Sequence, residues 1–460
     1  MQPESQLTAF IREQRPDELS DDAARISRLV LLAAIGTGVA GASEDGIGAL
    51  RELLLSRGGT PQARTFVFGD RLPAHAAAQF NGTMCRALDY CDAMAPGIHI
   101  GSSVVPTAFA AAELAGGCNG AEFLAALAIG CEVGARFNLT ESMYDGFDPT
   151  GVAIVFASTA TAARLLRLSD VQTLHALGLA FNRCGGSFQS NIDGTLAVRV
   201  IQGWVALTGI ECAQMALHGI SGPVNFLSGV YGYPHLYGRD RLDPAAMVAG
   251  LGRDWRLDRM VFKKYPSCGV TQALTELTLD LVAEFELTPA RVQHVEVRLP
   301  PYSHKLVGHP FRLGTNPRVD AQFSAQYCVA NAIVRRASKL AHFRPEQVAD
   351  AEIQALIEKV TVVADPALDA RGHTAVDVTL TTTDGRTQTR RLDIAPGFPG
   401  NGLSRAQQIA RFADCMAYAE PALPQRQVDA FLNGVEALDS LDDARVLVDL
   451  LIVPQRRSAG

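Results

Sequence analysis

The sequence predicts a mainly α-helical protein, in which a smaller α+β domain is inserted into a large helical domain. With 460 residues, the chain exceeds the size at which a single hydrophobic core usually stops growing, so at least two domains are expected. Residues 21–260 are rich in Ala and Leu and place apolar side chains at helical spacing, whereas strand-like alternation appears only later. A helical pattern returns at Ser404. We therefore predict an all-helical domain of residues 1–262 plus 395–460 and an α+β domain of residues 263–394.

The helical domain has clear start signals. Ser20 is placed to cap a helix that carries Asp21 and Asp22 in its first turn. Several later segments are apolar on nearly every side, which is typical of helices buried in a large bundle or in an oligomer interface. The helices predicted in this part of the chain cover residues 103–116, 121–138, 151–166, 169–183 and 200–219.

The α+β domain is predicted from alternation and turn chemistry. Residues 292–300 alternate like a strand, and residues 350–366 join a helix to a strand. Residues 373–394 predict a hairpin that turns at Asp384-Gly385, with β-branched residues on both sides. Between these elements, residues 320–337 predict a helix. Ser404 and Gln407 then form the capping-box pattern that begins the C-terminal helices.

Composition and missing motifs exclude several classes of function. A net charge of −7 without any basic run argues against nucleic acid, and no apolar run reaches the roughly 20 residues that span a membrane. Nine cysteines without a CxxC pair and an N-terminus without a signal core predict a reduced, cytoplasmic protein. His304 and His309 are five residues apart, in a segment whose prolines indicate a loop. We expect neither a metal nor an organic cofactor, because the ligand spacings and glycine-rich phosphate loops are missing.

The segment Asn81–Pro106 is the leading candidate for chemistry. Asp89 and Asp92 lie three residues apart at the end of a predicted helix, where such residues share a face. A glycine-bounded turn follows and carries His99, which can fold back over that face. A carboxylate beside an imidazole is a common device for moving protons near neutral pH. The alternative is that the aspartates cap the helix or face water and that His99 is an ordinary loop residue.

Two further segments carry polar side chains at places suited to ligands. Asp148 precedes Pro149 at a helix start, which favours a plain cap over an anion site. Lys263 and Lys264 lie where the helical pattern gives way to the α+β pattern, and lysines there can hold carboxylates or be solvated. Cys268 follows closely as a possible low-pKa nucleophile, although no partner for it is evident.

Five stretches of the chain carry a resemblance to a known family, namely residues 88–114, 146–166, 263–276, 321–334 and 396–412. Taken together and in this order, they resemble the 2-methylcitrate dehydratase / cis-aconitate decarboxylase (MmgE/PrpD) family. The resemblance implies a large all-helical domain built from both termini, a smaller α+β lid, and a homodimer. It also implies an active site between the two domains that works without metal or organic cofactor.

Matching motif to motif assigns roles. The resemblance places Asp89 and His99 at the catalytic aspartate and histidine of the family. It also places Lys263 at a lysine before an aromatic-Pro pair, and Tyr327 at the tyrosine of the QFS-x-x-Tyr motif. His99, tuned by Asp89, is then the predicted proton carrier, and Tyr327 the second one. Lys263, with Arg199, would bind a substrate carboxylate, and Asp92, Cys268 and Asp148 complete the predicted substrate-binding set.

The chain also departs from the family pattern. Asp148 stands where a histidine often precedes Pro-Thr, and Ala93 stands where the decarboxylase has a threonine. Cys268 replaces a decarboxylase histidine, and Val198 replaces a lysine for which the adjacent Arg199 is a possible substitute. The lost cations and imidazole predict a substrate other than cis-aconitate, with fewer carboxylates.

Three hypotheses about function follow. The first is a cofactor-independent lyase of the dehydratase type that acts on a small hydroxy di- or tricarboxylic acid related to 2-methylcitrate. The second is an epimerase or isomerase of a related dicarboxylic acid, similar to an iminodisuccinate epimerase. It needs the same proton carriers but no leaving group. The third is a non-catalytic family member kept as a binding or structural dimer.

Overall fold

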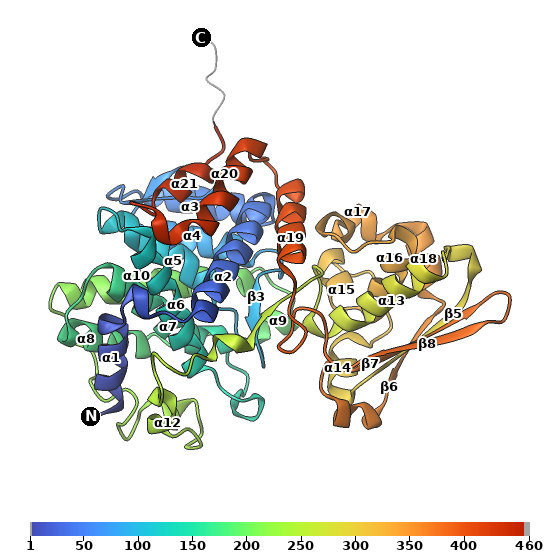
Figure 1. Cartoon of the computed structure of the whole chain (residues 1–460), viewed down its shortest axis with the longest axis horizontal. Helices are drawn as coiled ribbons and strands as arrows, with labels where there is room; N and C mark the ends of the chain where they lie inside the picture. Colours follow the sequence, from blue (N-terminus) through green and yellow to red (C-terminus); the bar gives the residue numbers. More distant parts are fainter. Residues whose placement is uncertain (1, 455–460) are drawn as a thin grey trace, which may run out of the picture. The chain divides into compact units, whose positions relative to one another are not determined.

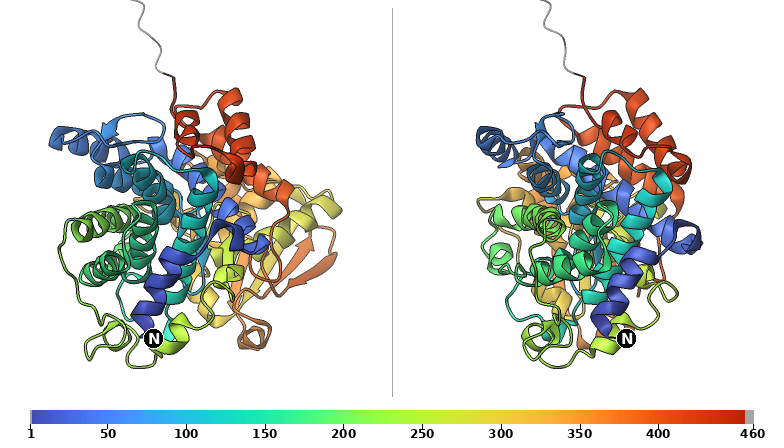
Figure 2. Two further views of the ribbon diagram at one scale, coloured as in Figure 1. Left: turned by 60° about the vertical axis from the view of Figure 1, so that its left-hand side comes forward. Right: turned by 90° about the vertical axis from the view of Figure 1, so that its left-hand side faces the viewer.

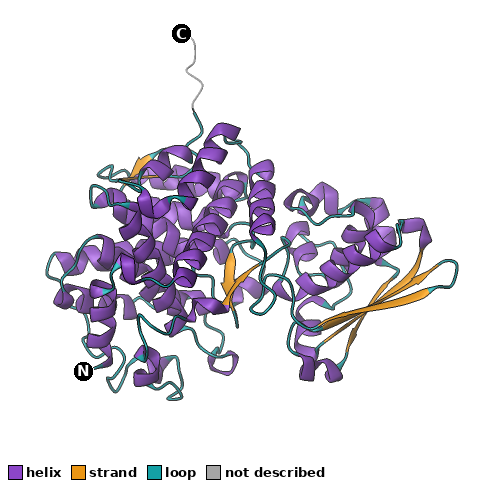
Figure 3. Cartoon of the chain, in the orientation of Figure 1, coloured by secondary structure: helices purple, strands orange, loops and turns teal. Residues whose placement is uncertain are grey.

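The computed structural model describes residues 2–454 and consists mainly of α-helices, as predicted (Figures 1 and 3). The chain divides into two compact units. Unit 1 comprises the residues up to Met260 together with those from Cys415 onward, and unit 2 comprises Val261–Asp414.

Unit 1 is built around four helices that pack against one another. Glycines allow this close packing: a Cβ on Gly203 would lie 2.4 Å from the carbonyl oxygen of Gln79 on the neighbouring helix. The four central helices are α4 (Ala74–Arg86), α5 (Gly101–Leu114), α7 (Pro149–Leu165) and α10 (Ala197–Leu217). Around them lie α1 (Pro3–Glu13), α2 (Asp21–Ala40), α3 (Ile47–Arg57), α6 (Gly120–Phe137), α8 (Asp170–Phe181), the short α9 (Gln189–Ile192), α11 (Tyr233–Leu236) and α12 (Pro244–Val248), and the short strands β1 (Ala63–Arg64), β2 (Arg71–Leu72) and β3 (Asp92–Met94).

The helices predicted from periodicity are confirmed. The five predicted ranges correspond to α5, α6, α7, α8 and α10, with bounds that differ by a few residues. The predicted cap is also present, since the hydroxyl of Ser20 accepts a hydrogen bond from the backbone N–H of Ala23 at 3.2 Å. In these segments local pattern and tertiary structure agree.

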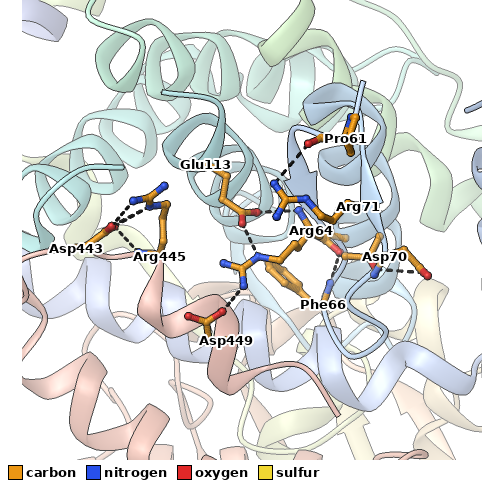
Figure 4. A network of polar contacts seen from close by, with 11 residues as sticks. Pro61, Arg64, Phe66, Asp70, Arg71, Glu113, Asp443, Arg445 and Asp449 are labelled. Atoms are coloured by element: carbon orange, nitrogen blue, oxygen red, sulfur yellow. Dashed lines mark hydrogen bonds and ion pairs between the residues drawn. The ribbon is translucent and has the colours of Figure 1, made fainter. Parts of the chain in front are cut away.

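The C-terminal segment completes unit 1 by adding to the N-terminal helices (Figure 2). Helix α20 (Gln425–Glu436) packs on α2, and the carbonyl of Leu441 accepts a hydrogen bond from Gly120 N at 2.8 Å. Figure 4 shows the polar part of this attachment, in which Arg64 of β1 pairs with Glu113 of α5 and with Asp449 of α21 (Val446–Leu450). Side-chain and backbone bonds thus join segments more than 300 residues apart.

Two helices of unit 1 have the length and hydropathy of a membrane-spanning helix. The segment Asp21–Ser43 has a mean hydropathy of 1.6 and is 83% buried, and Ala197–Leu217 has 1.2 and is 56% buried. Packing inside the bundle accounts for the apolar character of the first segment. The second segment, α10, leaves Trp204, Met215 and Leu217 between 40% and 51% exposed.

Unit 2 contains a four-stranded sheet in the order β6-β5-β7-β8. Strand β5 (Val292–Leu299) pairs in parallel with β6 (Val360–Ala364) and antiparallel with β7 (Val376–Thr382), which forms a hairpin with β8 (Thr387–Leu392). The predicted hairpin is confirmed, and Gly385 of its turn has φ +82°. Helices α13 (Gln272–Glu284) and α16 (Ala325–Arg335) pack on the sheet, and α18 (Ala351–Ile357) packs on α16.

One local prediction in unit 2 is wrong. The segment around His304 forms helix α14 (Pro301–Val307) rather than a loop, because Pro300 and Pro301 occupy the N-cap and first helical positions, where proline fits. Two short helices, α15 (Pro317–Gln322) and α17 (Pro345–Val348), also lie within unit 2. The short strand β4 (Met260–Phe262) and the longer helix α19 (Arg405–Tyr418) each span a boundary between the two units in the sequence.

Candidate functional site

The loop between α4 and α5 carries the predicted catalytic residues of unit 1. Helix α4 ends at Arg86, and Asp89 has φ 51°, in the left-handed region that ends a helix. Asp92 then begins the short strand β3. The expectation that Asp89 and Asp92 share a helix face is therefore wrong, because the helix ends before either of them.

Asp92 organises the start of α5. Its carboxylate accepts hydrogen bonds from the backbone N–H groups of Ile100 (3.1 Å) and Gly101 (2.9 Å), and the residue is 0% exposed. A Cβ at position 101 would lie 2.3 Å from Oδ1, so glycine is needed for this approach. The carboxylate stabilises the positive end of the helix. This position does not fit the substrate-binding role that was predicted for Asp92.

His99 is oriented by the backbone. Its Nδ1 lies 2.8 Å from the carbonyl oxygen of Asp92 and 3.4 Å from Cys91 Sγ. A carbonyl can only accept, so Nδ1 carries the proton of the neutral ring and the lone pair lies on Nε2. The backbone N–H of His99 donates to Thr150 Oγ1 at 3.2 Å, which ties the loop to the start of α7. His99 therefore has the tautomer of a general base acting through Nε2.

A buried arginine accompanies Asp89. Arg86 Nη1 lies 2.5 Å from Asp89 Oδ1, and the two side chains are only 9% and 15% exposed. Burial lowers the pKa of Arg86, but the nearby charges of Asp89 and Asp148 outweigh it and raise that pKa above its ordinary value. Arg86 was not predicted from the sequence, although it lies three residues before Asp89, a spacing at which side chains of a helix interact. A direct coupling of Asp89 to His99 stays a prediction.

Asp148 is the N-cap of α7, the interpretation that the sequence favoured. Its Oδ1 accepts from Gly151 N at 3.0 Å, and Pro149 occupies the first helical position. Burial raises the pKa of Asp148, while the Gly151 N–H and the charge of Arg86 partly offset this. A direct contact with substrate stays a prediction for this residue.

Arg199 is held inside unit 1 at the start of α10. Its Nη1 donates to the carbonyl of Asp45 at 2.8 Å, and its Nη2 lies 3.8 Å from Glu44 Oε2. The other oxygen of Glu44 accepts from the Tyr418 hydroxyl at 2.9 Å. These contacts anchor Arg199 to the segment that precedes α3, so its predicted role as a second cation for substrate is not favoured by its position.

In unit 2, the segment that begins at Lys263 is fixed by one glutamine. Gln272 exchanges hydrogen bonds with the backbone of Tyr265 (2.8 and 3.0 Å) and donates to the carbonyl of Cys268 at 3.2 Å. Lys263 and Cys268 are 5% and 9% exposed. The Lys264 side chain is 22% exposed and forms a 2.7 Å ion pair with Glu276. The two adjacent lysines therefore have different environments.

Tyr327 lies inside unit 2. Its ring is 0% exposed between Phe311 and Phe343, and its hydroxyl donates to the carbonyl of His342. Burial raises the pKa of Tyr327. This arrangement does not fit the proton-transfer role predicted for the residue, because its proton is committed to a backbone acceptor.

Among residues 2–454, no group of three or more His, Cys, Asp or Glu side chains could hold a metal ion. All nine cysteines are free thiols.

Comparisons with known proteins give one consistent result. The model of the MmgE/PrpD N-terminal domain matches residues 5–243, and that of the MmgE/PrpD C-terminal domain matches residues 265–439. Cis-aconitate decarboxylase of Homo sapiens is 26% identical over 399 residues, which cover 84% of this chain and 80% of the relative. The cis-aconitate decarboxylase of Mus musculus is 24% identical, with 97% and 93% covered. That of Aspergillus terreus is 24% identical, with 85% and 84% covered.

Proposed function

Because the chain belongs to the MmgE/PrpD family, we propose that it is a lyase that acts on a small hydroxy di- or tricarboxylic acid. The observation that carries this proposal is the His99 ring, whose Nδ1 is held by the Asp92 carbonyl so that Nε2 presents a lone pair. A fixed imidazole of this tautomer is suited to removing a proton next to a carboxylate. The relatives named as decarboxylases support lyase chemistry in general.

The reaction that we propose is a dehydration. His99 Nε2 takes the proton from the carbon next to a carboxylate, and the electron pair moves onto that carboxylate as an enolate. The electrons then form the carbon–carbon double bond while the C–O bond to the neighbouring hydroxyl breaks. The imidazolium returns its proton to the departing hydroxide, which leaves as water. The resemblance to the family implies Lys263 as a cation for a substrate carboxylate, and this role stays a prediction.

Three replacements support dehydration over decarboxylation of cis-aconitate. Ala93 has no hydroxyl, Cys268 has no imidazole, and Asp148 serves as a helix cap. The resemblance to the decarboxylases places a threonine at the first position and a histidine at the second, and a histidine is frequent in the family at the third. A hydroxy acid related to 2-methylcitrate is therefore the substrate class that we propose.

A panel of hydroxy di- and tricarboxylic acids in deuterated water tests the proposal. Dehydration yields new absorbance near 240 nm and an alkene in the NMR spectrum. Release of carbon dioxide would instead identify a decarboxylase. Deuterium entry without loss of water would identify the epimerase, and silence across the panel would favour a non-catalytic protein. Any of these last three outcomes contradicts the proposed dehydration.

We also propose a cytoplasmic homodimer that needs no metal and binds neither nucleic acid nor membrane. The exposed apolar side chains Trp204, Met215 and Leu217 of α10 support a self-association surface. Light scattering after gel filtration should give twice the 49.1 kDa chain mass, and Trp204→Glu should give the monomer. Turnover should persist in EDTA, and restoration of lost activity by a divalent ion would contradict metal independence.

A further inference from the structure

The Arg86 guanidinium has one nitrogen paired with a carboxylate and one buried nitrogen without an acceptor. Nη1 pairs with Asp89, whereas Nε is buried without a hydrogen-bond partner among the described residues. The side chain is only 9% exposed, so water has little access to satisfy this donor. Buried charged donors of this kind are costly to leave unpaired.

The Nε/Nη2 edge is the part of a guanidinium that matches the two oxygens of a carboxylate. The chain itself uses the edge in this way elsewhere. Arg51 places Nε and Nη2 at 2.6 and 2.8 Å from the two carboxylate oxygens of Asp70. Arg164 does the same with Glu122, at 2.5 and 3.0 Å. Arg86 is buried at least as deeply as these arginines, yet its Nε has no acceptor among the described residues.

Arg86 and the proposed base share neighbours in unit 1. The charge of Arg86 is sensed at Cys91, whose Sγ is 3.4 Å from His99 Nδ1. It is also sensed at Asp148, which caps α7, and Thr150 in the first turn of α7 accepts a hydrogen bond from the His99 backbone. Arg86 therefore lies in the same part of unit 1 as His99.

We propose that the Nε/Nη2 edge of Arg86 binds a carboxylate group of the substrate and holds it next to His99. The identification of this ligand as the substrate rests on the proposed function. The bound carboxylate supplies the acceptor that Nε lacks, while Asp89 keeps Nη1. Because one guanidinium edge accommodates one planar carboxylate, Arg86 selects substrates with a carboxylate near the reacting carbon.

Calorimetry with tricarballylate tests the assignment, because this tricarboxylate has no hydroxyl to lose and binding needs no turnover. Arg86→Gln should raise the dissociation constant roughly 10- to 100-fold, the usual range for a lost charge-assisted pair. Arg86→Lys keeps the charge but loses the planar edge, and should weaken binding at least fivefold. Arg51→Gln, whose edge is already filled by Asp70, is the matched control and should stay within twofold.

Dissociation constants within twofold of wild type for both Arg86 variants would overturn the assignment, as would wild-type protein that does not bind tricarballylate at millimolar concentration. If Arg86→Gln does not fold, Arg86→Gln/Asp148→Asn restores the charge balance and answers the same question. Binding that depends on Arg86 without turnover of any hydroxy acid would defeat the proposed function alone. Turnover with an unchanged KM in Arg86→Gln would defeat only the assignment of Arg86.

Discussion

His99 of unit 1 and Tyr327 of unit 2 were both predicted to carry protons, but their surroundings differ. A backbone carbonyl accepts from His99 Nδ1 and leaves the basic lone pair on Nε2. A backbone carbonyl also accepts from the Tyr327 hydroxyl, but that hydroxyl carries the only proton the residue could give. The same kind of contact therefore leaves a lone pair on one side chain and engages the proton of the other.

The largest effect is expected for His99. His99→Ala should lower turnover by ~10²–10⁴-fold, the usual contribution of a positioned general base. The melting temperature should change little, because a loop imidazole contributes little to packing. Steady-state kinetics and calorimetry measure the two quantities. Activity above a tenth of wild type would show that His99 is not the proton carrier, and His99 and Tyr327 would then not differ in this respect.

The next effect separates the two adjacent lysines of unit 2. Lys263→Met should raise KM by roughly 10-fold or more, and should also lower kcat if the contact tightens in the transition state. Lys264→Met is the matched control, since Lys264 is paired with Glu276, and it should change both constants by less than about twofold. Equal effects of the two substitutions would contradict a specific role for Lys263.

A smaller effect concerns the pH dependence of stability in unit 2. Burial and the charge of Arg335 lower the pKa of His342 to about 4, from an ordinary value of 6.5. Between pH 6.5 and about pH 4, His342 is therefore protonated in the unfolded chain but neutral in the folded one. Its contribution to the free energy of unfolding is present above pH 6.5 and is lost as pH falls toward 4. Allowing for partial exposure, we expect a loss on the order of 1–2 kcal/mol.

Urea unfolding at pH 7.5 and pH 4.5 measures this loss. His342→Asn, which keeps the backbone carbonyl that accepts from Tyr327, should lose less stability over the same interval. Identical pH dependence in the variant and the wild type would show that His342 does not titrate in this range.

The smallest effect is expected for Tyr327→Phe. Removing the hydroxyl takes a donor from the His342 carbonyl and should cost about 1 kcal/mol of stability. Turnover should remain within about threefold of wild type. A fall in kcat of more than 100-fold with unchanged stability would instead identify Tyr327 as a proton carrier, as is proposed for His99.

The candidate site was only partly predictable from the sequence. The motif around Asn81–Pro106 identified His99, and Pro149 identified Asp148 as a cap. Arg86 was missed because one arginine at the end of an apolar helix has no signature by itself. Its significance comes from burial and from neighbours on other elements, Asp148 among them. Asp92 was assigned to the substrate, but the chain turns at Asp89 and directs the Asp92 carboxylate to α5.

The sequence by itself determined the mainly helical class, the long helices of unit 1 and the hairpin of unit 2. Apolar periodicity, caps and turn residues act within a few positions, so a local pattern is sufficient for such elements. Only the tertiary structure decided which nitrogen of His99 is basic, where the Tyr327 proton goes and which nitrogen of Arg86 lacks an acceptor. These properties depend on hydrogen-bond partners and burial, and such partners are supplied by folding rather than by neighbours in the chain.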